Sequence, residues 1–205
     1  MPHWGLFFVT LFLLSTLRVA WARPGDSPRQ VVAFTDALGS TVEISAPVRR
    51  IVTINGAYKT VSDGSGADKV LAQAGVQNIA AGQPVPWPEI TAEWVVEQDP
   101  ELIVKVASPT YIKTGYGIKN ARAIDDFFAE LTHRPAWQQM QAVRQGRVHI
   151  LSSELWIGPR APLGILYIAK WAYPERFKDI DPQAVHQQWL MKWHGKELKG
   201  IYVYP

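Results

Sequence analysis

An alternation of short apolar segments with amphipathic segments, which starts near residue 50, limits the fold more than any other feature of the sequence. Residues 102–106 (LIVKV) are typical of a mostly buried parallel strand, and residues 148–151 predict a later strand. Between them, apolar side chains at positions 124, 127, 128 and 131 follow the spacing of an amphipathic helix. This alternation predicts an α/β fold: a single three-layer lobe with a central parallel or mixed sheet and helices on both faces.

Other segments complete the expected set of elements. Residues 31–34 and 41–44 predict a hairpin that turns at Gly39, and residues 50–54 predict a third strand. Thr91 and Asn120 are each expected to cap a helix. The expected helices cover residues 66–74, 91–98, 120–131, 135–146, 162–173 and 182–194.

The N-terminal residues predict export. Residues 5–17 form an uncharged apolar run, and the small residues Ala20 and Ala22 follow it, so we expect a signal peptide over residues 1–22 that is cleaved after Ala22. The alternative is a membrane anchor, but the run is short for the ~30 Å of hydrocarbon that an anchor must cross. The segment before the run, MPHW, has no Lys or Arg, which departs from the usual pattern. Residues 23–30 are expected to form a flexible leader, and the mature protein is expected to be periplasmic or otherwise exported.

The composition excludes several classes of function. The chain has no Cys, which excludes disulfides, thiol nucleophiles and Cys-based zinc sites. Its formal net charge is +3 and its Lys and Arg residues are scattered, so no nucleic-acid partner is expected. The five His residues are widely spaced and there is no HExxH or GxSxG motif. We therefore expect no metal, no cofactor and no enzymatic activity.

One loop combines residues suited to ligand binding. Residues 156–163 (WIGPRAPL) lie between a predicted strand and a predicted helix, where open α/β sheets usually bind ligands. Arg160 offers a rigid fork of donors for carboxylate, phosphate or catecholate-type oxygens, and Trp156 offers a flat apolar face. The alternative is equally consistent with the sequence: Arg160 binds helix carbonyls and Trp156 packs in the core.

Three further aromatic residues are candidates for ligand contact, and two of them, Tyr111 and Tyr116, fall on the same edge of the predicted sheet. Tyr111 and Tyr116 lie in the loop after the strand at 102–106, although exposed tyrosines without a ligand are the simpler interpretation. Trp87 lies between two prolines in residues 85–90 (VPWPEI), where the chain is expected to be extended before the helix that Thr91 caps.

Four longer segments carry a more specific signal: residues 34–54 (FTDALGSTVEISAPVRRIVTI), 78–106, 134–175 and 194–205. Together they resemble a known family, the periplasmic binding proteins of iron-siderophore, haem and cobalamin ABC importers. The first segment resembles the family's first hairpin and strand and the other three resemble its C-terminal lobe, so the resemblance covers most of the mature chain. It implies two α/β lobes that are joined by a long helix and hold the ligand between them.

The sequence departs from this family in its length. Almost all of the N-terminal lobe and the connecting helix are missing, so the resemblance implies one domain over residues 31–205. Within it, residues 31–55 are interpreted as a remnant of the N-terminal lobe and residues 56–205 as a C-terminal lobe, with residues 50–54 in the place of that lobe's own first strand. A cleft that is closed on one side buries less of its ligand, so we expect weaker binding than in a complete family member.

The resemblance also implies roles for individual residues and for partners. Glu93 matches an acidic residue that docks on the ABC permease. The leading hypothesis is the substrate-binding component of an ABC importer for a metal chelate (ferric siderophore, haem or cobalamin), with membrane contact only through the permease. The alternative is a single-lobe interaction protein that docks on a permease or self-associates without transporting a ligand. The residues expected to contact the ligand are Trp156, Arg160, Tyr58, Tyr111, Tyr116 and Trp87.

Overall fold

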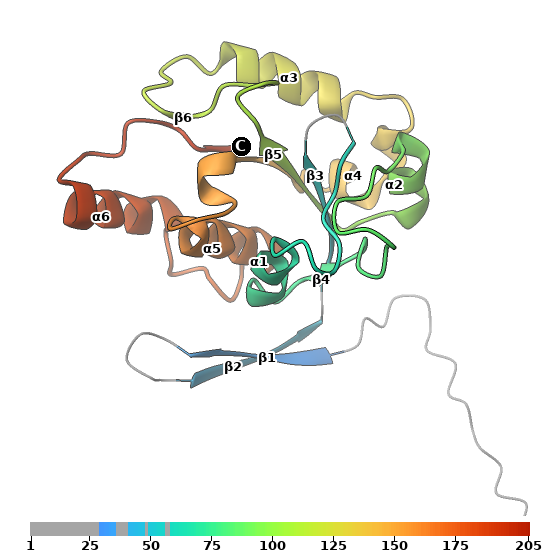
Figure 1. The fold of residues 1–205 in the computed structure, drawn as a ribbon, viewed down its shortest axis with the longest axis horizontal. Helices are drawn as coiled ribbons and strands as arrows, with labels where there is room; N and C mark the ends of the chain where they lie inside the picture. Colours follow the sequence, from blue (N-terminus) through green and yellow to red (C-terminus); the bar gives the residue numbers. More distant parts are fainter. Residues whose placement is uncertain (1–28, 36–40, 48, 56–57) are drawn as a thin grey trace, which may run out of the picture.

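A central five-stranded sheet organises the protein (Figure 1). The computed structural model describes residues 29–35, 41–47, 49–55 and 58–205. The sheet has the order β4-β3-β5-β7-β9. All neighbours pair in parallel except β7 and β9, which pair antiparallel. The sheet is therefore mixed and mostly parallel, as predicted, and its strands are β3 (Arg50–Asn55), β4 (Gln77–Asn78), β5 (Leu102–Ala107), β7 (Val148–Ser152) and β9 (Val203–Tyr204).

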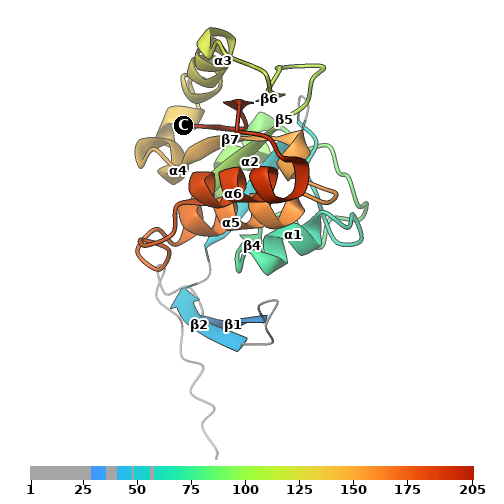
Figure 2. The same cartoon turned by 90° about the vertical axis from the view of Figure 1, so that its left-hand side faces the viewer.

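Helices cover both faces of this sheet (Figures 1 and 2), which confirms the three-layer prediction. The alternation along β5 explains the layers, because Leu102 and Val104 pack into the core on one face while Ile103 packs into the core on the other. One face carries α1 (Asp68–Gln73), α5 (Ala161–Ala172) and α6 (Pro182–His194). The other carries α2 (Ala92–Gln98), α3 (Arg122–Thr132) and α4 (Gln141–Arg144).

Two small antiparallel pairs complete the described strands. β1 (Arg29–Thr35) pairs with β2 (Thr41–Pro47), which confirms the two predicted hairpin strands, and β1 begins inside the segment expected to be a leader. In both views this hairpin lies apart from the central sheet. β6 (Gly115–Tyr116) pairs with β8 (Gly200–Ile201). The predicted signal peptide, its cleavage site and the turn at Gly39 lie outside the described residues.

The predicted helix starts are largely confirmed. Thr91 caps α2, because its hydroxyl accepts a hydrogen bond from the Trp94 amide at 3.1 Å. The Asn120 side chain accepts a hydrogen bond from the Arg122 amide at 2.8 Å, just before α3. In the part of the chain that the structure describes, no helix is both long enough and apolar enough to cross a membrane.

One predicted helix, over residues 135–146, is wrong. The segment forms the 3₁₀ helix η1 (Trp137–Gln139) and the short helix α4, which are separated by Met140 in an extended conformation (ψ 143°). Asp99 provides the physical reason, since its carboxylate accepts a hydrogen bond from the Gln141 amide at 2.7 Å and so caps α4 at this break. The apolar spacing is the same as in one continuous helix, which is why the sequence did not reveal the break.

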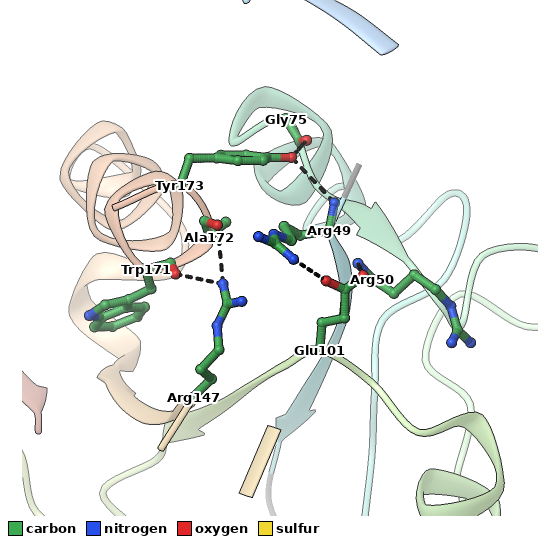
Figure 3. Close-up of polar contacts among 8 residues, drawn as sticks. All are labelled: Arg49, Arg50, Gly75, Glu101, Arg147, Trp171, Ala172 and Tyr173. Carbon is green, nitrogen blue, oxygen red and sulfur yellow. Dashed lines mark hydrogen bonds and ion pairs between the residues drawn. The ribbon is translucent and has the colours of Figure 1, made fainter. Parts of the chain in front are cut away.

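Partly buried polar contacts tie the helices to the amino edge of the sheet, where β3, β5 and β7 begin (Figure 3). Arg49 lies 2.5 Å from the Glu101 carboxylate. Arg147 donates from Nη2 to the carbonyls of Trp171 and Ala172 at 3.0 and 3.1 Å, which satisfies the last turn of α5 with a cation. These contacts fix the amino edge and leave the opposite, carboxyl edge to the loops.

Candidate ligand-binding site at the carboxyl edge of the sheet

Three neighbouring parallel strands end at the same edge of the sheet. β3, β5 and β7 end at Asn55, Ala107 and Ser152, and the loops that follow them lie side by side. Ligands of open α/β sheets bind at this carboxyl edge. We therefore refer to the loops that follow these three strands as the carboxyl-edge loops.

An open cavity of about 650 Å³ lies at this edge, between the loops that follow β3 and β5 and residues 89–90 before α2, and no residue of the loop after β7 lines it. Tyr58 follows β3 and Tyr111 follows β5, so the structure brings together two of the residues predicted from the sequence. The volume lies within the range of about 300–1,000 Å³ that is typical of small-molecule sites. The cavity is lined by Asn55, Tyr58, Lys59, Glu89, Ile90, Ser108 and Tyr111.

Arg134 holds Tyr58 in place. Its guanidinium donates a hydrogen bond to the Tyr58 hydroxyl, and its Cζ lies 5.4 Å from the ring centroids of both Tyr58 and Trp137. Arg134 also lies 3.6 Å from Glu130 in α3. Because the phenol oxygen of Tyr58 already accepts from Arg134, this phenol has its own hydrogen left to donate to an oxygen atom of a ligand.

A buried cation lies beside this group. Lys105 in β5 is 4% exposed, and its Nζ lies 5.8 Å from the centroid of the Phe127 ring. Burial is the main reason why the pKa of Lys105 falls from 10.5 to about 8, and the positive charge of Arg134 lowers this pKa further. Lys105 is therefore still largely protonated at pH 7, which adds positive potential near the carboxyl end of β5. Such a potential favours an anionic or oxygen-rich ligand.

The predicted pair Trp156 and Arg160 is divided between the core and the edge. Trp156 is 3% exposed and packs in the core, which corresponds to the alternative stated from the sequence; burying its large apolar ring is favourable. Arg160 precedes α5, and its side chain is 28% exposed. Its guanidinium forms an ion pair with Glu154 and lies 5.8 Å from the centroid of the Trp189 ring. The arginine therefore pairs with a carboxylate in its own loop.

The other predicted residues are on the surface. Tyr111 and Tyr116 are 56% and 49% exposed, and Lys196 lies 5.3 Å from the centroid of the Tyr116 ring. Trp87 is 45% exposed and is absent from the lining of the cavity at the carboxyl edge. Glu93 is exposed in the first turn of α2, where the positive end of the helix dipole favours a carboxylate.

Sequence reasoning missed Lys59, Lys105 and Arg134. Of these three, only Lys105 could have been noticed in the sequence, because it is the single charged residue in the apolar strand segment LIVKV. Arg134 is 76 positions away from Tyr58 in the chain, so their contact depends on tertiary structure.

Other cavities lie outside this group. One of about 760 Å³ lies between α3 and the loop at residues 111–120, and it shares Tyr111 with the cavity at the carboxyl edge. Another, of about 220 Å³, is lined in part by His186 and Tyr202. Burial is the main reason why the pKa of His186 is lowered to about 4, and the positive charge of Arg160 contributes as well. The His186 ring is therefore neutral at pH 7. Across the described residues, no three or more His, Cys, Asp or Glu side chains gather in a way that could hold a metal ion.

A three-layer α/β lobe with an open, polar and aromatic cavity at the carboxyl edge of its sheet has the architecture of a ligand-binding lobe. The sequence profile of the periplasmic binding proteins matches residues 29–155. The chain belongs to this family, which confirms the resemblance.

Individual relatives show how much of the family architecture the chain contains. The molybdate-binding protein MolA of Haemophilus influenzae is 24% identical over 172 residues, which are 81% of this chain and 44% of that protein. The crystal structure of the TroA-like periplasmic binding protein FepB from Veillonella parvula superposes with a TM-score of 0.70 at 23% identity, over 78% of this chain and 49% of that one. MolA bound to molybdate superposes with a TM-score of 0.58 at 21% identity, over 81% of this chain and 45% of that one. The chain thus spans about half the length of these relatives.

Proposed function

We propose that this protein is the substrate-binding component of an ABC importer and that it binds its ligand at the carboxyl-edge loops. The observation that carries this proposal is the cavity of about 650 Å³ at this edge, where Tyr58 and Tyr111 face a common space. Membership of the periplasmic binding protein family supports export to the periplasm and delivery to a permease. In this proposal the protein reaches the membrane only through the permease, after cleavage near Ala22, and it carries no cofactor.

The ligand is proposed to be a metal chelate: a ferric siderophore, haem or cobalamin. Phenol donors, Lys59 and the nearby cations Arg134 and Lys105 suit a ligand with a periphery of anionic oxygens. The similarity to a molybdate-binding protein adds a simple oxyanion to the ligands that should be tested. One lobe covers one side of such a ligand, so the rest of the ligand stays in contact with water and the affinity is modest.

The predicted residues take different roles in this proposal. Tyr58 and Tyr111, which line the cavity, are proposed to contact the ligand, together with Arg160 from the neighbouring loop after β7. The exposed rings of Tyr116 and Trp87 lie outside the cavity lining and are proposed to contact the outer parts of the ligand. Trp156 supports the loop of Arg160 from within the core. Glu93 is proposed to dock on the permease, because its exposed carboxylate in α2 is available to a basic partner.

A second candidate function is interaction without transport, in which the lobe docks on a permease or on a second copy of itself. The observation that favours it is the exposure of Tyr111 and Tyr116 in a chain about half as long as its relatives. Size-exclusion chromatography with light scattering distinguishes the two arrangements. A dimer that persists without ligand supports self-association, and a monomer at all concentrations argues against it.

The test of transport-type binding is a fluorescence titration of the mature protein, which is rich in Trp. Ferric enterobactin, haemin, cyanocobalamin and molybdate are titrated separately, with correction for absorbance by the ligand. We expect saturable quenching by one of them and a loss of affinity of about tenfold or more in Arg160→Ala, because a charge-assisted hydrogen bond is worth about 1.5–3 kcal/mol.

The matched control is Arg144→Ala. Arg144 is exposed in α4, which leads into the amino end of β7, so this substitution should leave the affinity unchanged. A folded protein that binds none of the four probes would overturn the proposal.

A further inference from the structure

Glu154 and Arg160 form an ion pair at the carboxyl end of β7. Glu154 lies in the 3₁₀ helix η2 (Ser153–Leu155), directly after the strand, and Arg160 lies immediately before α5. The guanidinium Nη1 donates to a carboxylate oxygen of Glu154. The Arg160 side chain is 28% exposed and the Glu154 side chain is 39% exposed, so a solute can reach both of them.

The Glu154 carboxylate occupies a defined position against the backbone of a second loop. Gly115 in β6 has φ +98°, and a Cβ atom built there would collide with the carboxylate of Glu154. The loop after β5 therefore approaches the carboxylate closely because residue 115 has no side chain. Glu154 thus fills the space between the Arg160 guanidinium and the backbone of Gly115.

The guanidinium is held from a second side. Its Cζ lies 5.8 Å from the ring centroid of Trp189 in α6, a cation–π distance. Tyr202 is close to both charges: burial raises the pKa of its hydroxyl, the negative charge of Glu154 raises it further, and Arg160 acts in the opposite direction. Arg160 is therefore oriented by its neighbours, while its Nη1 donates to an internal carboxylate.

We propose that Glu154 masks Arg160 by occupying the position in which a ligand oxyanion would bind the guanidinium. This inference rests on the proposed function, because Arg160 is the proposed ligand contact in the loop after β7. A ligand must displace the Glu154 carboxylate before it reaches Arg160, and the partial exposure of Glu154 lets its side chain turn toward water. The pair therefore admits strongly anionic ligands to Arg160 and keeps weakly anionic ones away from it, because these cannot compete with a carboxylate, whereas a neutral ligand makes no use of the guanidinium charge.

The expected effect follows from the strength of such a pair. Ion pairs at partly exposed positions contribute up to about 1 kcal/mol, so removing the charge of Glu154 should tighten the binding of an anion to Arg160 by about fivefold. Glu154→Gln keeps the shape of the side chain and its contact with Gly115. A neutral ligand should bind the variant and the wild type equally.

The first experiment uses sulfate as the anion probe and does not require the natural ligand. The unfolding temperature is measured against sulfate concentration, with chloride at equal ionic strength as the reference. Glu154→Gln and Glu154→Ala should reach half-saturation at about one-fifth of the wild-type sulfate concentration. Glu97→Gln, which neutralises an exposed carboxylate in α2, should match the wild type. Adding Arg160→Ala to Glu154→Gln should abolish the gain.

The second experiment titrates the same variants with molybdate and with electrically neutral cyanocobalamin. Tighter molybdate binding in Glu154→Gln with unchanged cyanocobalamin binding supports masking. If Glu154→Gln binds sulfate with the same affinity as the wild type does, and molybdate likewise, the masking proposal is overturned, even if the wild type binds a chelate. A sulfate effect that depends on Arg160, in a protein that binds none of the chelates or molybdate tightly, would support masking and count against the proposed function.

Discussion

Replacing Lys105 by Met should stabilise the protein, because the folded state keeps this cation out of water. The pKa of Lys105 falls from 10.5 to about 8, chiefly through burial, and a difference of this size corresponds to about 3 kcal/mol at neutral pH. Met has a similar length and no charge, so it fills the same space against Phe127. Substitution also removes the favourable contacts of the ammonium group, so we expect a net gain of about 1–3 kcal/mol in the free energy of unfolding at pH 7.

The pH dependence separates this electrostatic explanation from better packing. Between about pH 8 and pH 10.5 the unfolded state still binds the Lys105 proton while the folded state releases it, so the wild type gains stability as the pH rises through this window. Lys105→Met lacks this gain. The difference in stability between the two proteins should therefore be largest below pH 8 and should shrink toward pH 10.5. Urea denaturation followed by Trp fluorescence at pH 7, 8, 9 and 10 measures this difference.

The control is Lys69→Met, which removes an exposed lysine of α1. It should change the free energy of unfolding by less than about 0.5 kcal/mol at each pH. A Lys105→Met protein that is less stable than the wild type at pH 7, or whose advantage does not change with pH, would show that burial of the charge is not the cause. A stabilised Lys105→Met that binds an anionic ligand more weakly would indicate that the buried cation is kept for binding.

Three other perturbations test single features of the fold. Gly115→Ala should lower the free energy of unfolding by about 1–3 kcal/mol in urea denaturation, because the φ of residue 115 is positive and the new Cβ meets Glu154; unchanged stability would contradict this geometry. His186→Phe should reduce the loss of stability between pH 6.5 and pH 4, since the pKa of His186 is lowered to about 4 and only the unfolded state takes up the proton in this range; an unchanged acid profile by circular dichroism would argue against this effect. Thr91→Ala removes the side-chain cap of α2 and should lower the free energy of unfolding by about 1 kcal/mol, measured by thermal unfolding, whereas Thr91→Ser should retain the wild-type stability.

The sheet and its layers could be predicted because each segment carried its own hydrophobic pattern. Residues 102–106 are almost wholly apolar because β5 is buried on both faces, and the i, i+3, i+4 spacing in α3 marks one buried side. The break at Met140 could not be predicted in the same way. It depends on Asp99, which is distant from Gln141 in the chain, so the cap of α4 is a tertiary contact that the local sequence does not reveal.

The site was predicted only in part, because the sequence identifies loops but not the contacts between them. The rule that ligands bind at the carboxyl edge directed attention to the loops of Tyr111 and Arg160, which follow β5 and β7. The family resemblance directed attention to Tyr58, which lines the same cavity as Tyr111. The sequence could not show that Trp156 turns into the core, since an indole suits a core and a ligand surface equally well. Nor could it pair Arg134 with Tyr58, because nothing local in the sequence links positions so far apart.

The two edges of the sheet use charge in different ways, and this difference supports the placement of the ligand. At the amino edge, the pair of Arg49 and Glu101 is partly buried, with 35% and 15% of the side chains exposed, and it joins the starts of neighbouring strands. Near the carboxyl end of β5, Lys105 remains charged at a cost to stability. The pair of Glu154 and Arg160 lies in exposed loops, where water or a ligand can compete for it. Charges that fold stability does not explain are therefore found where a ligand could use them, which is the expected pattern for a binding edge.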